Sequence, residues 1–138
     1  MSDGYPFVSI QVVWDDAAQS MIRMIIEGSW TWEAMQDARS EVGVLLDMVP
    51  HEVTILLDLL KSRGLPNGYM WQFRRLNMAS HPNAGPTVVI TEDGLVISLA
   101  QMLNKLDCDK PDRRGVYTAP TLEDAQALAR SLRAGAET

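Results

Sequence analysis

The sequence predicts an α/β protein in which helices pack on a mixed sheet. Segments rich in β-branched residues alternate with segments whose apolar residues recur every three or four positions. One strand segment, VTILLDLL, is almost continuously apolar, which is typical of a strand covered on both faces. The predicted order is β-β-α-β-α-β-α-β-α. Since a hairpin opens this order and helical crossovers follow it, we expect one antiparallel strand beside a set of parallel strands.

Five segments have the composition of strands. The polar stretch DDAAQ separates the first two, as in a β-hairpin. In the second segment Ile22, Met24 and Ile26 share one face, while Arg23 and Glu27 lie on the other. The third segment contains VTILLDLL and is the predicted central strand. The predicted strands are residues 6–14, 20–28, 52–60, 85–91 and 115–119.

Four segments have the period of amphipathic helices. Ser29 or Thr31 is available to cap the first helix, which stops before Pro50, and Thr121 is available to cap the last. The predicted helices are residues 29–49, 66–80, 94–106 and 120–132. Their predicted inner stripes are Met35, Ala38, Val42, Leu45 and Leu46 in the first, Tyr69, Phe73 and Leu76 in the second, Leu95, Leu99, Met102, Leu103 and Leu106 in the third, and Ala125, Leu128, Ala129 and Leu132 in the fourth.

The composition indicates one soluble domain. A chain of 138 residues with 46% hydrophobic and 22% charged residues can bury a core of its own. We therefore expect a single domain over residues 1–138, with frayed ends at 1–5 and 134–138. The N-terminus lacks the parts of a signal peptide, and no apolar stretch approaches the ~20 residues that span a bilayer. These features predict a cytoplasmic protein that does not enter the membrane.

Charge and the types of reactive residue exclude further classes. A net charge of −6 disfavours nucleic acid as a partner, because phosphate binding needs clustered lysine and arginine. Cys108 is the only cysteine, so an intramolecular disulfide is impossible and a structural zinc site is disfavoured. His51 and His81 lack the serine or cysteine motif of a catalytic triad. We expect no catalytic residue, no metal and no cofactor, and therefore no enzyme.

The order of elements resembles a known family. With an opening hairpin, three strand-helix units, VTILLDLL as the central strand and TVVI as the next, the chain from about Phe7 to Leu132 resembles the STAS and SpoIIAA-like superfamily of anti-sigma-factor antagonists. The resemblance implies a STAS-like sandwich that acts as a non-enzymatic regulatory module. It also implies a protein partner, such as a regulatory kinase or an anti-sigma factor, that docks on the loop after the central strand and on the following helix.

The resemblance also directs attention to one serine. In the regulated members the loop after the central strand carries an Asp-Ser-Ser/Thr-Gly motif whose serine or threonine is phosphorylated. The nearest match here is Lys61-Ser62-Arg63-Gly64, which makes Ser62 the candidate phosphoacceptor. Because a lysine replaces the leading acid and an arginine follows the serine, we expect a module without the usual phosphoswitch.

A second apolar face on the predicted helix 66–80 suggests a contact surface. Trp71, Arg75 and Met78 lie nearly opposite the inner stripe of this helix, with Arg74 beside them. Trp, Met and Arg are enriched in interfaces, and the surface suits another protein or a second copy in a homodimer. The other interpretation is that Trp71 and Met78 pack on a neighbouring helix or loop. The predicted partner-binding residues are Ser62, Arg63, Asn67, Trp71, Arg74, Arg75 and Met78.

The loops at the carboxyl ends of parallel strands are the usual meeting place for ligands and partners. We place residues 60–68, 80–83 and 92–94 there. Two other functions stay open. Asp15-Asp16, Asp58, Thr91 and Pro120 faintly resemble the phosphoacceptor site of response-regulator receiver domains. The eight methionines and the related lipid-binding folds keep a small apolar-ligand or lipid carrier as an alternative.

Overall fold

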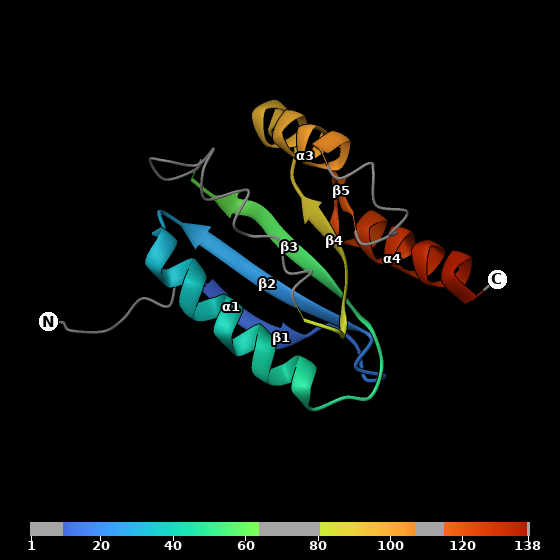
Figure 1. The fold of residues 1–138 in the computed structure, drawn as a ribbon. Helices are drawn as coiled ribbons and strands as arrows, with labels where there is room; N and C mark the ends of the chain where they lie inside the picture. Colours follow the sequence, from blue (N-terminus) through green and yellow to red (C-terminus); the bar gives the residue numbers. More distant parts are fainter. Residues whose placement is uncertain (1–9, 64–80, 107–114, 138) are drawn as a thin grey trace, which may run out of the picture.

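A computed structural model describes residues 10–63, 81–106 and 115–137 of the chain. Within them β1 to β5 form one sheet whose order is the order of the chain. β1 pairs with β2 antiparallel, and β2 to β5 pair in parallel. The strands are β1 (Ile10–Trp14), β2 (Met21–Gly28), β3 (Val53–Ser62), β4 (Ala84–Ile90) and β5 (Val116–Ala119), and the helices are α1 (Trp32–Asp47), α3 (Gly94–Leu106) and α4 (Leu122–Glu137) (Figure 1). The fold class and the central strand are as predicted, and the predicted helix 66–80 lies outside the described residues.

The middle strand, β3, is buried on both faces, and its side chains alternate between two cores. Ile55 and Leu57 point to one face, where they pack with residues of β2, α1 and α3. Leu56 points to the other face, which α4 covers. Ile55 is 1% exposed and Leu56 is fully buried, and burying a side chain of this size contributes about 1.5 to 3 kcal/mol. Helices therefore cover both faces of the sheet (Figure 1).

α1 forms where the sequence predicts a helix and buries the predicted stripe. Its N-cap is Thr31, whose hydroxyl accepts a hydrogen bond from the amide of Ala34 at 3.1 Å. The buried residues of the helix are Met35, Ala38, Val42 and Leu46. The predicted stripe therefore faces the core, with Leu45 partly buried at its border.

α4 begins as predicted and ends later. The Thr121 hydroxyl accepts a hydrogen bond from the amide of Asp124 at 3.1 Å, and Ala125 and Ala129 are buried against the sheet. The helix continues to Glu137, beyond the predicted end at residue 132. Alanine and glutamate favour helix, which accounts for the longer segment in spite of one glycine. Most of the segment that we expected to fray is helical.

α3 is where the structure corrects the predicted inner stripe. The residues that face the core are Val96, Leu99 and Ala100, while Leu95 is 48% exposed and Met102 is 38% exposed. The helix is apolar nearly all round, so its sequence allows two stripes with the period of a helix. The direction in which α3 leaves the sheet determines which of these stripes faces the core. The correction leaves an apolar face of α3 in contact with solvent.

A local irregularity at the start of β4 requires a glycine. Val53 pairs with Ala84 and Ile55 with Thr87, so β4 has one residue more than β3 over this interval. A side chain at Gly85 would place its Cβ atom 2.8 Å from the carbonyl oxygen of Val53. The next residue is a buried proline, which has no amide hydrogen to donate and fits a bulge.

The hairpin loop between β1 and β2 is held by one carboxylate. Asp16 accepts hydrogen bonds from the amides of Ser20 at 2.9 Å and Met21 at 3.1 Å, and from the Ser20 hydroxyl. Burial alone would raise the pKa of Asp16, but these hydrogen bonds outweigh it and lower the pKa below the ordinary 3.8. Gln19 occupies the left-handed region at a φ of 57°, which the tight loop requires.

We expect Gly85→Ala to lower the free energy of unfolding by about 1 to 3 kcal/mol, because the added methyl group meets the backbone of β3. Gly43→Ala in α1 is the matched control. A Cβ atom there meets nothing within 4 Å, so the variant should gain about 0.5 to 1 kcal/mol from helix propensity. Urea unfolding followed by circular dichroism measures both, and equal stability of the two variants would contradict the close approach at Gly85.

A second prediction concerns the loss of stability at acid pH. Because the pKa of Asp16 is lower in the folded chain, its ionised form stabilises the fold above the ordinary pKa, and this contribution is lost as the pH falls through the folded value. Asp16→Asn should therefore be less stable at neutral pH and should lose less stability on acidification. Unfolding curves at a series of pH values measure this. Asp37→Asn, which removes an exposed carboxylate of α1, is the control for the loss of one negative charge, and a change in pH dependence equal to that of Asp16→Asn would contradict the prediction.

Candidate functional site at the carboxyl ends of the parallel strands

The carboxyl ends of β2, β3 and β4 lie at one edge of the sheet, where the segment after β4 leads into α3 (Figure 1). Gly28 pairs with Ser62 at the ends of β2 and β3, and the segment 91–93 leads from β4 into α3. Of the loops that we expected at this edge, 92–94 lies there, and the described part of 60–68 begins there. Residues 81–83 do not, because they precede β4 and lie at the amino ends of the strands, where Asn83 accepts a hydrogen bond from the amide of Val53.

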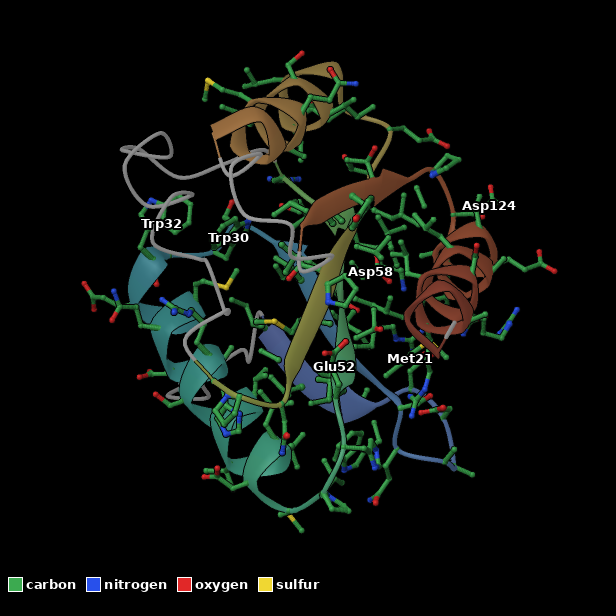
Figure 2. All side chains as sticks on the ribbon, turned by 45° about the vertical axis from the view of Figure 1, so that its right-hand side comes forward. Met21, Trp30, Trp32, Glu52, Asp58 and Asp124 are labelled. Carbon is green, nitrogen blue, oxygen red and sulfur yellow. The ribbon has the colours of Figure 1, made fainter. Side chains whose placement is uncertain are left out.

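Ser62 is the last residue of β3, two residues beyond the predicted end of that strand. Its hydroxyl oxygen accepts a hydrogen bond from the indole nitrogen of Trp30 at 2.8 Å. Trp30 is 6% exposed and meets Trp32 edge to face, with 4.8 Å between the ring centroids, at the start of α1 (Figure 2). The amide of Arg63 donates to the carbonyl of Gly28 at 2.8 Å, so the backbone on both sides of Ser62 belongs to the sheet.

Of the predicted partner-binding residues, the structure describes Ser62 and Arg63. The oxygen that would carry a phosphate on Ser62 is the acceptor for a buried tryptophan, and the phosphoacceptor role stays a prediction. Arg63 is exposed at the end of β3. Trp30 is buried near this site, and Trp14 and Trp32 are partly buried against the α1-side core. The remaining predicted partner residues, Asn67, Trp71, Arg74, Arg75 and Met78, lie outside the described residues.

A small cavity opens beside Ser62. Its volume is about 180 Å³, and its lining consists of Leu59, Leu60, Ser62, Thr91, Glu92, Asp93 and Val96. The hydroxyl of Thr91, which is 4% exposed, accepts a hydrogen bond from the amide of Asp93 at 3.0 Å. The Asp93 carboxylate in turn accepts from the amide of Leu95 at 2.9 Å and caps α3. The cavity therefore has an apolar wall and two carboxylates at its rim.

Asp58 shapes the same edge through the backbone. Ile25 pairs with Asp58 and Glu27 with Lys61, so β3 has one extra residue opposite Ile26. The Asp58 carboxylate accepts a hydrogen bond from the amide of Leu60 at 3.1 Å. Leu60, after the bulge, is 46% exposed. Asp58 thus stabilises the bulge, and an apolar side chain of β3 stands in solvent.

The structure does not form the receiver arrangement among the described residues. The amide of Asp15 bonds to the carbonyl of Met21, which pairs with the first residues of β3, so Asp15 lies at the amino ends of the parallel strands. Its carboxylate is 5% exposed, 3.7 Å from the Arg23 Nε atom and 2.7 Å from the amide nitrogen of Gln126. Thr91 follows the carboxyl end of β4, at the opposite edge.

Both histidines lie away from the candidate site and hold loops together. The amide of Asn83 donates to Nδ1 of His81 at 3.0 Å, which leaves Nε2 to donate to the Asp47 carboxylate at 2.7 Å. His51 Nε2 lies 2.9 Å from the carbonyl oxygen of Gln19. Ser40 and His81 line a second cavity of about 270 Å³ along α1, but both ring nitrogens of His81 are engaged and cannot take a proton from Ser40.

A substitution at Ser62 tests its role as the anchor of Trp30. Ser62→Ala leaves a buried indole N–H without its acceptor, and we expect a loss of about 1 to 3 kcal/mol in the free energy of unfolding. Ser40→Ala, an exposed serine of α1, should change it by about 0.5 kcal/mol or less. Urea unfolding followed by tryptophan fluorescence measures both. A Ser62→Ala variant as stable as Ser40→Ala would rule out the anchor.

Comparison with known proteins identifies the fold. No family model matches the chain, no curated protein has a significantly similar sequence, and no described helix is long and apolar enough to cross a membrane. Among solved structures, the chain is similar to an uncharacterized protein from the DUF3478 family, with a SpoIIAA-like fold, from Shewanella loihica PV-4. The TM-score is 0.63 at 15% sequence identity, over 94% of this chain and 98% of that chain. The resemblance predicted from the order of elements is thereby confirmed at the level of fold: the chain has a SpoIIAA-like fold.

Proposed function

We propose that the chain is a non-enzymatic regulatory module of the cytoplasm that binds another protein through the edge of the sheet where the parallel strands end. The observation that carries the proposal is the exposure of Leu60 and Leu95 at this edge, beside the carboxylates of Glu92 and Asp93. Apolar side chains that stand beside polar groups at a loop-rich edge are typical of interaction sites.

The engagement of the polar groups supports binding rather than catalysis. Ser62 accepts from Trp30, Asp58 accepts from the backbone of a bulge, and His81 is engaged at both ring nitrogens. These side chains stabilise the fold, and a reaction would have to break the contacts that hold them. The SpoIIAA-like fold is consistent with a regulatory role without the usual phosphoswitch.

The proposed contact surface combines two parts. One is the described edge with Ser62 and Arg63. The other consists of Asn67, Trp71, Arg74, Arg75 and Met78, which the sequence places on the predicted helix 66–80. A partner that covers both parts is a different protein, such as a regulatory kinase or an anti-sigma factor, or a second copy of the chain.

Affinity capture from the source cell tests the proposal. The full chain should retain a protein that Trp71→Ala with Met78→Ala fails to retain, because truncating a tryptophan and a methionine at the centre of an interface costs about 2 kcal/mol or more. Circular dichroism establishes that the double variant is folded, and sedimentation of the purified chain measures whether the partner is a second copy.

The matched control is Val44→Ala with Met48→Ala. Val44 lies in α1 and Met48 caps its C-terminus; their side chains are 61% and 66% exposed and lie outside the proposed surface. The control should retain the partner. If the Trp71 and Met78 variant keeps every protein and every oligomer that the wild type forms, the proposed surface is wrong.

A further inference from the structure

We infer that the edge formed by Leu60, Glu92, Asp93, Leu95 and Met102 docks a segment of another protein in which an arginine or lysine is flanked by apolar side chains. The inference rests on the proposed function and specifies the chemistry of the partner. We call these five residues the acidic–apolar face. Three observations carry the inference. Glu92 and Asp93 have no basic partner among the described residues, the stretch of α3 from Gly94 to Asn104 has no charged residue, and the whole chain has a net charge of −6.

Several acids in the described part of the chain have a basic partner, and the carboxylates of the acidic–apolar face have none there. Glu27 lies 3.9 Å from Lys61, Asp47 bonds to His81, and Asp15 lies beside Arg23. Within the described residues Glu92 has no ion pair, and the Asp93 carboxylate accepts a hydrogen bond from the backbone amide of Leu95.

The position of these carboxylates strengthens their attraction for a cation. Both lie at the rim of the cavity of about 180 Å³, whose wall includes Leu59 and Val96. A carboxylate beside an apolar wall attracts a cation more strongly than one surrounded by water, because the wall lowers the local dielectric constant. The stem of an arginine or lysine that enters here can lie on Leu60.

The outer face of α3 supplies the apolar part of the surface. Leu95 and Met102 are seven residues apart, which places them on the same side of the helix, and both are exposed. The exposed residues Ser98 and Gln101 between them are uncharged, and the sequence has no charged residue from Gly94 to Asn104. Exposed helix faces of soluble proteins usually carry charges, whereas interface cores are depleted of them and enriched in methionine.

The charge of the whole chain decides which occupant the surface fits. A second copy would bring a net charge of −6 against −6, which opposes association at long range. A basic segment of a different protein is attracted by the net charge and by the carboxylates of Glu92 and Asp93 together. The occupant is therefore a basic and apolar segment of another protein.

Selection from a random peptide library displayed on phage, with the full chain as target, tests the inference. The selected peptides should contain arginine or lysine next to leucine, methionine or an aromatic residue. For the best peptide, made synthetically, fluorescence anisotropy measures the affinity. Glu92→Lys with Asp93→Lys should weaken binding by roughly tenfold or more, and Leu95→Glu should do the same by placing a charge in the apolar contact. Affinity should also fall as salt is raised.

Two control variants separate the site from the overall charge. Asp37→Lys with Glu41→Lys makes the same change in net charge on the exposed side of α1, which lies away from α3 in Figure 1. Met48→Glu adds a charge at the exposed apolar residue that caps the C-terminus of α1. Both controls should bind the peptide within about twofold of the wild type.

Several outcomes would overturn the inference. They are a library without binders, selected peptides without basic residues, and equal losses in the α1 charge control. Dimers of the purified chain that Glu92→Lys with Asp93→Lys dissociates would assign the face to a second copy and overturn it as well. If a cellular partner stays bound to this variant but is lost with Trp71→Ala and Met78→Ala, the further inference fails and the proposed function stands.

Discussion

The burial of β3 on both faces is the constraint on which the rest of the structure depends. A strand without a solvent face needs apolar side chains in both directions, and helices on both sides must supply their partners. Ile55 and Leu57 meet the α1 side and Leu56 meets α4. Near the carboxyl end of β3, the described helices no longer cover both faces of the strand. There a bulge held by Asp58 precedes the exposed Leu60, so the candidate site begins where the double coverage stops.

Most of the fold was predictable because the elements have strong periods and clear caps. The apolar run of β3, the stripe of α1 and the caps Thr31 and Thr121 are local signals, and the structure confirms each of them. The side of α3 that faces the core was not predictable, because apolar residues cover most of the helix and more than one inner stripe fits them. Register shifts such as the one at Gly85 depend on the neighbouring strand and leave no clear local pattern.

The candidate site was predictable in position and only partly in its members. The rule that loops at the carboxyl ends of parallel strands carry function selected residues 92–94 correctly, but it was misapplied to 80–83, which precede a strand. The hydrogen bond from Trp30 to Ser62 joins residues 32 positions apart, so the sequence could not reveal it. Leu95 and Met102 were missed because the predicted stripe of α3 is rotated from the buried one, with which it shares Leu99. Trp71, Arg74, Arg75 and Met78 stay a prediction of the sequence.

The strand order has a consequence for the way the chain is made. Because β1 to β5 lie in the sheet in the order in which they are synthesised, each new strand pairs with the one that precedes it. The sheet grows at a single side as the chain leaves the ribosome, and no strand has to be inserted between two that have already paired. Among the described helices, however, only α4 packs on the face of β3 that carries Leu56, and it is made after the five strands. The apolar side chains on this face therefore gain their α4 contacts only after the five strands have been made, and a chaperone that binds apolar segments would protect them in the interval.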